Sequence, residues 1–351
     1  MYVYFWIKFC YNFNMENQER YKHLNKYLKN KFGERTLKIC IDAGFTCPNR
    51  DGTKSTEGCI FCSNRGSGEH INPEQSISNQ VNNYFSSYKA ERANKFIAYF
   101  QNFTNTYDTI ENLKNKYNSA LIDDRIVGLA IATRPDCINE DVIRLLKSYT
   151  KKYYVWVELD LQTSNEQTGK LINLQYTSTD FTNAVNLLNK NGIDVVTHIM
   201  VGLPNEGFDN IKNTVNFINK HNIQGLKIHS TYIIENTKLA EMYKKGDYTP
   251  ITLENYLNQC AYILTHISPD IVIHRISGDA PKNLLIAPEW NSHKKWILNG
   301  LDKLMREQNL YQGMYWKNIN FNGRSWPATT TSLNLLLLFL ELHEHYHKLL
   351  Y

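Results

Sequence analysis

The chain has 351 residues, 42% of them hydrophobic and 13% aromatic, and a formal net charge of +5. These values fit a soluble globular protein with a sizeable core, built as one large domain or two smaller ones. Seven cysteines, an odd number in a chain of this length, argue against a secreted disulfide scaffold and favour the reducing cytoplasm. No run reaches the roughly 18 apolar residues that a membrane-spanning helix needs, so no membrane association is expected.

The two ends of the chain are expected to be additions to the main domain. The first 13 residues are aromatic-rich but contain Lys8 and no small-residue cleavage site, so a signal peptide is only weakly indicated. Met15 opens a polar, helix-compatible stretch, which makes residues 1–14 a candidate non-native extension. The expected parts are an N-terminal extension (1–24), a core domain (25–285) and a C-terminal helical segment (286–351) whose apolar run 335–340 is typical of one packed helix.

From residue 36 onward, strand-like and helix-like runs alternate. The predicted strands are residues 37–42, 96–102, 126–132, 154–161, 195–201 and 226–234, with a seventh run at 271–276. The predicted helices are residues 73–88, 109–117, 140–149, 181–189, 209–220 and 253–267. Such β-α repeats predict a parallel sheet with crossover helices, and strands that are apolar throughout are buried on both faces. Since six or seven units are too few for an eight-fold barrel, we predict a single α/β domain with an open or partial barrel.

Three cysteines lie in the loop that follows the first predicted strand. Cys47, Cys59 and Cys62 are spaced C-x11-C-x2-C. A [4Fe–4S] cluster normally takes four cysteine ligands, so three would leave one iron with an open position where chemistry can occur. Structural zinc is the alternative, but Cys40 falls inside the preceding strand and His70 has no partner histidine at zinc-site spacing. A loop without metal is the remaining alternative.

Polar side chains gather where the predicted strands end, and the C-terminal edge of a parallel sheet is where α/β enzymes place their active sites. Polar groups inside buried strands are costly unless they are paired, so this collection indicates a site at the same edge as the cysteine loop. For Glu158 and Gln162 the alternative is a structural network at the strand ends, and for the histidines it is a satisfied position in the core. The residues concerned are Gln101, Thr104 and Asn105, then Glu158, Asp160 and Gln162, and finally His198, Lys227, His229, His274 and Arg275.

At these residues the sequence resembles the radical S-adenosylmethionine (SAM) superfamily, and within it the YhcC/YtqA-type proteins, a group similar to the catalytic subunit of Elongator. The resemblance covers about residues 20–300 and implies a partial (β/α)6 barrel with short N-terminal and C-terminal helical additions. It also implies a [4Fe–4S] cluster on Cys47, Cys59 and Cys62, with SAM on the open iron. The segments that carry it are residues 44–52 (GFTCPNRDG), 58–62 (GCIFC), 99–101, 128–137, 201–204 and 274–276.

The resemblance implies roles for further residues near SAM. Phe61, between two ligands, resembles the aromatic residue that flanks the adenine, although packing under the loop is the alternative. Gln101, with Thr104 and Asn105, stands where the superfamily usually has a small-residue motif that meets the SAM amino group. The candidates for polar SAM contacts on the fourth strand are Glu158 and Gln162.

The later strands supply candidate catalytic residues across from the cysteine loop: His198, His229, His274 and Arg275. Arg275 is the best candidate to hold substrate, because a guanidinium can bind a carboxylate or phosphate through two hydrogen bonds. The chain departs from the family in two places. Asp160 stands where the family usually has glycine, and residues 172–176 (INLQY) stand in place of Ile-Asn-Arg-Gly-His. The loss of that arginine and histidine would alter substrate handling or mark a divergent member.

The resemblance further implies tRNA wobble-uridine modification, in which a carboxymethylaminomethyl side chain is converted to an aminomethyl one. The expected partners are tRNA and a low-potential electron donor such as flavodoxin or ferredoxin, without DNA. The net charge and the lysines within residues 26–31 are compatible with RNA, although such runs are more typical of a solvated face. The alternatives are a radical SAM enzyme that acts on a small metabolite or protein, and a non-catalytic iron–sulfur or zinc binding module.

Overall fold

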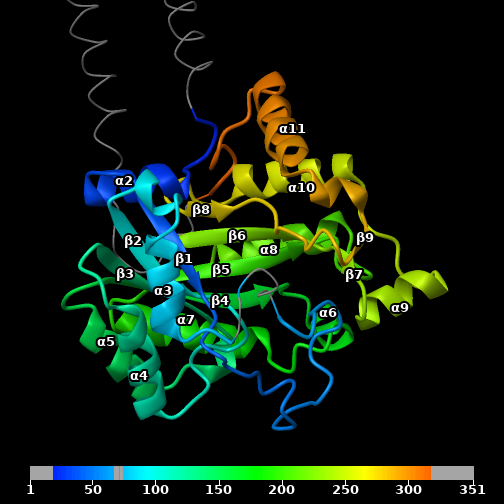
Figure 1. Cartoon of the computed structure of the whole chain (residues 1–351). Coiled ribbons are helices and arrows are strands. Elements are labelled where there is room, and N and C mark those ends of the chain that lie inside the picture. Colours follow the sequence, from blue (N-terminus) through cyan, green and yellow to red (C-terminus); the bar gives the residue numbers. More distant parts are fainter. Residues whose placement is uncertain (1–18, 67–70, 72–73, 318–351) are drawn as a thin grey trace, which may run out of the picture. The chain divides into compact units, whose positions relative to one another are not determined.

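The computed structural model describes residues 19–317 except 67–70 and 72–73, and it contains the predicted parallel sheet. Seven strands lie side by side in the order β1-β2-β3-β4-β5-β6-β8, and each neighbouring pair is parallel. In the described part of the chain, β1 and β8 remain the two edges of this sheet, which curls into a half-barrel (Figure 1). The strands are β1 (Thr36–Ile41), β2 (Lys95–Phe100), β3 (Ile126–Thr133), β4 (Tyr154–Gln162), β5 (Asp194–Val201), β6 (Gly225–Ser230) and β8 (Val272–Arg275). The expected α/β partial barrel is confirmed.

Crossover helices cover the outer face of the sheet (Figure 1). Most of them begin at a polar cap: the Thr177 hydroxyl, for example, accepts a hydrogen bond from the Asp180 amide, and the Asp180 carboxylate accepts one from the Thr177 amide. Their apolar faces pack on the outward strand residues in the main core. The helices are α3 (Ile77–Phe85), α4 (Ile110–Ala120), α5 (Glu140–Tyr149), α7 (Ser178–Lys190), α8 (Phe208–Ile218) and α10 (Leu253–His266).

The two faces of the sheet differ in chemistry, because successive strand residues point to opposite sides. In β2, Phe96 and Phe100 face outward into the main core. Ile97 and Tyr99, between them, face inward and pack with Trp156 of β4 in a smaller cluster. This cluster fills the amino-terminal part of the half-barrel with apolar side chains. The carboxyl-terminal part of the inner face is therefore left to the polar residues.

The sixth predicted strand, 226–234, is wrong in its extent. It ends at Ser230, and β7 (Ile233–Ile234) pairs antiparallel with β9 (Leu285–Ala287) in a separate two-stranded sheet. The end of β6 coincides with that of its partner β5, because Ser230 lies opposite Val201, the last residue of β5. The predicted helix 73–88 is also longer than α3, which begins after the Ser76 cap, whose hydroxyl accepts a hydrogen bond from the Asn79 amide.

Helix α2 (Leu24–Phe32) packs across the amino-terminal ends of both sheet edges. Leu24 and Leu28 contact Val272 of β8, and Phe32 packs against the inner cluster. The remaining helices are α6 (Glu166–Leu171), α9 (Lys238–Lys245), α11 (Lys294–Glu307) and the 3-10 segments η1 (Ala90–Arg92), η2 (Pro135–Cys137) and η3 (Glu289–Ser292). Helix α11 packs into the main core. The expected helix at 335–340 and residues 1–18 lie outside the described residues. No described helix has both the length and the apolar character needed to cross a bilayer.

The close approach of β2, β3 and β4 gives a test of the packing. A Cβ at Gly128 would lie 2.6 Å from Ile97 Cδ1 and 2.8 Å from the Tyr154 carbonyl oxygen. Gly128→Ala is therefore expected to lower the free energy of unfolding by about 1–3 kcal/mol, measured as a lower urea midpoint. The matched control is Gly169→Ala in α6, where the nearest atom lies 3.6 Å away and stability should hold or rise. An unchanged midpoint for Gly128→Ala would contradict this packing.

Candidate active site

The cysteine loop, residues 42–66, leaves the carboxyl end of β1 and is held by one arginine. The Arg50 guanidinium donates hydrogen bonds to the carbonyl oxygens of Cys62 at 3.1 Å and Ser63 at 2.7 Å. Gly58 allows this closure, because a Cβ there would lie 2.9 Å from Arg50 Nε and its φ of 71° favours glycine. Arg50 thus ties the middle of the loop to its last cysteine.

Two asparagines dock the loop on the turn after α6. Asn49 Nδ2 donates to the Asn173 carbonyl oxygen at 2.5 Å, and Asn173 Nδ2 donates to the Gly58 carbonyl oxygen at 2.7 Å. The Ile60 carbonyl oxygen accepts a hydrogen bond from the Leu239 amide at the start of α9. The loop is therefore fixed at several points over the carboxyl-terminal end of the half-barrel. None of these anchoring roles was predicted from the sequence.

Cys47, Cys59 and Cys62 are free, partly buried thiols on this loop. The hydrogen bond between the side chains of Cys59 and Cys62 raises the pKa of Cys59 well above its usual value and, helped by Arg50, lowers that of Cys62. With the side chains as they stand, no three His, Cys, Asp or Glu residues of the described ranges could hold a metal ion together. Three thiols on one loop are nevertheless the donor set of an iron–sulfur site with one open position.

Among the described residues, no group of side chains is arranged as a zinc site. Cys40 lies within β1 opposite Tyr99 in the strand register, and it packs against the inner cluster. Burial raises the pKa of the Cys40 thiol, which makes it a poorer metal ligand. His70 lies outside the described residues.

The residues after β2 join the cysteine loop to the sheet. Gln101 directly follows β2, and its amide donates to the Ile41 carbonyl oxygen at 3.5 Å. The Thr104 amide donates to the Thr46 carbonyl oxygen at 3.1 Å, and Asn105 Nδ2 donates to the Ala132 carbonyl oxygen at 2.7 Å. Both Thr104 and Asn105 keep a buried side-chain oxygen without a partner among the described residues.

Gln162 ends β4 in a strained position. Its φ is 61°, and the register shifts between Asp160 and Gln162, which is the geometry of a bulge. Bulges and left-handed residues at the end of a strand often re-aim a side chain at a functional site. Gln162 Oε1 is buried and has no hydrogen-bond partner within the described ranges. Phe61, by contrast, packs against the apolar cluster formed by the cysteine loop, α6 and α9.

Glu158 lies at the centre of the inner face and has no solvent exposure. Its carboxylate accepts hydrogen bonds from Lys227 Nζ, from His198 Nε2 at 2.9 Å and from Trp156 Nε1 at 3.0 Å. Lys227 Nζ also donates to the Tyr99 hydroxyl at 2.7 Å. Side chains from β2, β4, β5 and β6 thus meet at one carboxylate. The sequence-predicted residues Glu158 and His198 belong to this network.

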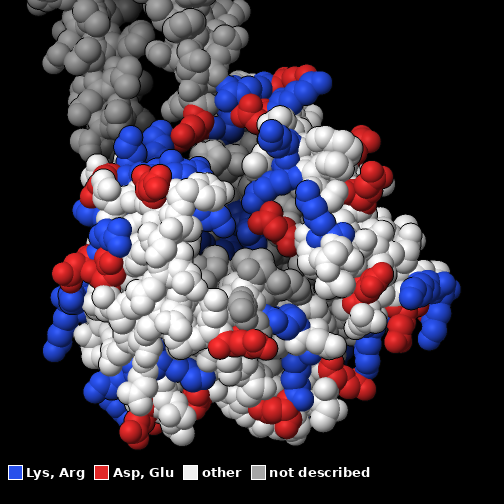
Figure 2. Space-filling model, in the orientation of Figure 1, with Lys and Arg blue, Asp and Glu red and all other residues white. Residues whose placement is uncertain are grey.

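Burial and charge set the ionisation of this network. Burial would raise the pKa of Glu158, but the ammonium groups of Lys227 and Lys38 and the His198 hydrogen bond hold it well below its usual value. Burial lowers the pKa of Lys227 to about 7, although Glu158 acts in the opposite direction. The face that the half-barrel presents in Figure 2 is hollowed near its middle, with Lys or Arg atoms at the floor of the hollow.

His229 and His274 are buried on the same inner face as neutral rings. Burial first, and neighbouring positive groups second, hold both pKa values well below the usual range. His229 Nε2 and His274 Nδ1 have no hydrogen-bond partner in the described part of the chain. Arg275 lies farther out, with 36% of its side chain exposed, and pairs with Asp279 at 2.7 Å. The structure therefore brings the three histidines together around Glu158 and leaves Arg275 at the rim.

Asp160 connects this network to the cysteine loop. His198 Nδ1 lies 3.0 Å from Asp160 Oδ1, so the imidazole bridges Asp160 and Glu158. The Asp160 charge also acts on the Cys62 thiol, which places it near the last cysteine. Asp160 was among the predicted strand-end residues, whereas Lys38 and Tyr99 were not. The available signal was their spacing, since each is a polar residue set two positions from another inward side chain of its strand.

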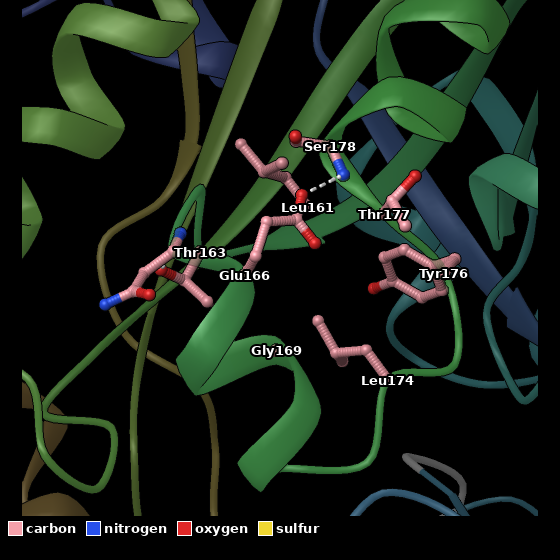
Figure 3. Close-up of a pocket in the computed structure, with 9 residues that line it drawn as sticks. Leu161, Thr163, Glu166, Gly169, Leu174, Tyr176, Thr177 and Ser178 are labelled. Atoms are coloured by element: carbon pink, nitrogen blue, oxygen red, sulfur yellow. Dashed lines mark hydrogen bonds between the residues drawn. The ribbon is translucent and has the colours of Figure 1, made fainter.

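A small pocket lies beside the end of β4 (Figure 3). The Tyr176 hydroxyl points toward it and has no hydrogen-bond partner among the described residues. Burial, with the nearby charges of Asp160 and Cys59, raises the pKa of Tyr176 well above its usual value. The two departures from the family pattern, Asp160 and Tyr176, therefore lie near each other. The pocket is lined by Leu161, Thr163, Asn165, Glu166, Gly169, Leu174, Tyr176, Thr177 and Ser178.

Comparison with known families and sequences agrees with this geometry. The model of the radical SAM superfamily matches residues 49–218, and the model described as the Radical_SAM C-terminal domain matches residues 223–307. YtqA of Bacillus subtilis is 37% identical over 304 residues, covering 86% of this chain and 94% of that protein. YhcC of Escherichia coli K12 is 31% identical over 304 residues, covering 86% of this chain and 96% of that protein.

More distant relatives are similar over part of their length. A tRNA uridine(34) acetyltransferase of Methanocaldococcus infernus is 28% identical over 166 residues, which cover 46% of this chain and 30% of that protein. The solved structure of archaeal Elp3 from the same organism, with an N-terminal deletion, has a TM-score of 0.59 at 19% identity and covers 79% of this chain and 64% of that one. This likeness supports the fold.

Members of the radical SAM superfamily are enzymes that use a [4Fe–4S] cluster and SAM, so the alternative of a non-catalytic binding module is wrong. The match over residues 49–218 contains Cys59, Cys62, Glu158, His198 and the turn after α6, and the match over residues 223–307 contains Lys227, His229 and His274. The two close relatives are matched over nearly their whole length. The chain therefore belongs to the radical SAM superfamily, within its YhcC/YtqA-type proteins, which are related to Elongator.

Proposed function

We propose that this chain holds a [4Fe–4S] cluster on Cys47, Cys59 and Cys62 and reductively cleaves SAM to start radical chemistry on a substrate in the half-barrel. The observation that carries the proposal is the set of three free thiols on a loop anchored over the polar inner face. When bound, the cluster and SAM together supply the 5′-deoxyadenosyl radical, which is chemistry of the cofactors and not of the side chains.

The protein's part in this proposal is to hold, orient and shield the cofactors. Arg50, Asn49 and Asn173 fix the cysteine loop, and Cys47, Cys59 and Cys62 on this loop would hold the iron. The nearby Arg50 guanidinium favours the thiolate of Cys62, and thiolates are the iron ligands. Low-potential electron donors such as flavodoxin or ferredoxin are the proposed partners for reduction, in the cytoplasm.

SAM is proposed to lie between the cysteine loop and the ends of β2 and β4. Buried polar atoms without a partner are rare in folded proteins, and a polar ligand would satisfy them. Several such atoms lie at this edge of the sheet, which supports a polar ligand there. The residues proposed to contact SAM are Phe61, Gln101, Thr104, Asn105, Glu158 and Gln162.

The proposed substrate is tRNA, at a wobble uridine whose carboxymethylaminomethyl side chain becomes aminomethyl. Its support is the partial similarity to an archaeal tRNA uridine(34) acetyltransferase and to Elongator complex protein 3. The proposed substrate-binding residues on the later strands are His198, His229, His274 and Arg275. The alternative is a radical SAM enzyme that acts on a small metabolite or protein. In that case the tRNA nucleosides would be the same with and without the gene.

Loss of any one of the three loop cysteines is expected to abolish the cluster, because two thiolates cannot hold it in place of three. Cys47→Ala, Cys59→Ala and Cys62→Ala, reconstituted anaerobically, should lack the broad visible absorbance and the roughly four irons per chain of a [4Fe–4S] centre. Cys137→Ala and Cys40→Ala serve as matched controls and should keep both. Stoichiometric zinc without iron in the anaerobically purified protein would contradict the cluster proposal.

Gln101→Ala is expected to weaken SAM binding while it leaves the iron content intact, because Gln101 directly follows β2 and is not a ligand of iron. SAM affinity is measured by equilibrium dialysis, and its cleavage by release of 5′-deoxyadenosine with a strong reductant. The control Gln308→Ala lies at the exposed end of α11 and should behave as the unmodified protein. Equal SAM affinity in Gln101→Ala would remove Gln101 from the site.

The tRNA substrate is tested in cells without the gene. Mass spectrometry of tRNA nucleosides should show accumulation of the carboxymethylaminomethyl nucleoside, and the plasmid-borne gene should reverse it. A plasmid-borne gene with Arg275→Lys should not reverse the accumulation, because lysine cannot form the two-bond contact with an oxyanion. The control is Arg306→Lys, since Arg306 is also paired with an aspartate on its own segment. A gene with this change should reverse the accumulation as the unmodified gene does. Identical nucleosides with and without the gene would overturn the tRNA assignment.

A further inference from the structure

Two lysines from distant strands of the open sheet meet inside the half-barrel at one aromatic ring. Lys38 of β1 places its ammonium 4.6 Å from the ring centroid of Tyr99, and Lys227 of β6 places its ammonium 4.4 Å from the same centroid. The only carboxylate that the described structure pairs with both lysines is Glu158. Two positive charges so close together, one of them buried, are costly unless each is compensated.

The two lysines are not compensated equally. Lys227 donates hydrogen bonds to Glu158 and to the Tyr99 hydroxyl. Lys38 Nζ lies 4.0 Å from Glu158 Oε1, too far for a hydrogen bond, and it makes none with any described residue. An ammonium has three donors, so Lys38 keeps its full hydrogen-bonding capacity for another group.

A second unsatisfied donor lies beside Lys38. His274 Nδ1 is 3.9 Å from Glu158 Oε1, the same oxygen that Lys38 approaches, and it is buried without a partner in the described ranges. A neutral imidazole can donate from this nitrogen. The Lys38 ammonium and the His274 imidazole lie 4.0 Å and 3.9 Å from Glu158 Oε1. They form two sides of a small polar site.

The surroundings of this site favour negative charge. The charged groups of the inner face are Lys38, Lys227, Arg275, Glu158 and Asp160, and its other titratable groups are Cys40, Tyr99, His198, His229 and His274. Glu158 already accepts three hydrogen bonds, and Asp160 is paired with His198. The inner cluster with Trp156 packs beneath these groups and excludes water from that side. A positive charge in such an apolar setting attracts an anion more strongly than it would in water.

The site can be reached from outside. The Lys38 side chain is 22% exposed, whereas Lys227 and His274 are nearly fully buried. Figure 2 shows the hollow of this face with Lys or Arg atoms at its floor. Lys38 precedes the end of β1 by three residues, which is about 10 Å of strand below the cysteine loop.

We propose that Lys38 and His274 form an oxyanion-binding site inside the half-barrel, which receives a carboxylate or phosphate group of the substrate. That the oxyanion belongs to the substrate rests on the proposed function, but oxyanion binding by itself does not. The site lies inward of Arg275, so the two cations would act at different depths of the same hollow.

The direct test measures the affinity of inorganic phosphate and of acetate for the full-length reconstituted protein by NMR titration. Lys38→Met should weaken the affinity by about tenfold or more, because hydrogen bonds to charged groups contribute about 1.5–3 kcal/mol. Lys38→Arg should retain binding, and Lys29→Met, on the exposed side of α2, should be unchanged. Removal of Lys38 leaves Glu158 paired with Lys227 and His198, so the unfolding midpoint should be nearly constant.

Equal phosphate and acetate affinities in Lys38→Met and Lys29→Met would overturn the proposal. So would a loss of SAM affinity in Lys38→Met, since it would assign Lys38 to the cofactor. If Lys38→Met does not fold, phosphate protection of Lys38 against acylation in the unmodified protein, with Lys29 as the internal reference, decides the question. Absence of a cluster or of SAM cleavage would defeat the proposed function and leave the anion measurement unaffected, so the two failures are distinguishable.

Discussion

The buried carboxylate of Glu158 is the constraint on which the inner face of the half-barrel depends. A carboxylate without solvent must be paired, and here Lys227, His198 and Trp156 supply the hydrogen bonds. Because these partners come from three strands, one charge fixes the side chains of β4, β5 and β6 relative to one another. The pairing also leaves Lys38 with an ammonium that no described residue satisfies.

The division of the half-barrel into two halves follows from strand geometry. Inward residues near the amino ends are apolar and pack around Trp156, and inward residues near the carboxyl ends are polar. The cysteine loop leaves β1 at the polar end and is anchored there by Arg50, Asn49 and Asn173. A cofactor held by the loop would therefore face the polar half, with the apolar half behind it to exclude water. This arrangement suits radical chemistry, which requires water and stray hydrogen donors to be kept away.

The parallel sheet and most crossover helices could be predicted from the sequence, because buried parallel strands and amphipathic helices have clear patterns over five to ten residues. Helix α5 has the expected bounds, and α4, α7, α8 and α10 differ at their ends by one to three residues. The end of β6 could not be predicted, since it depends on where its partner β5 ends. The candidate site was predicted as a set of strand-end residues, and the proposed roles of those residues stay predictions.

By itself, the sequence determined which segments along the chain form strands and the place of Cys47, Cys59 and Cys62 on one loop. It also determined the membership in a superfamily, because all three follow from local pattern and motif. Only the tertiary structure decided which polar residues meet. Lys38 and Lys227 are 189 positions apart and reach the same ring only because the sheet curls. Arg50 and Asn173 act through backbone contacts that have no pattern in the sequence. Contacts between distant segments depend on curvature and register, which arise from the packing of the whole domain.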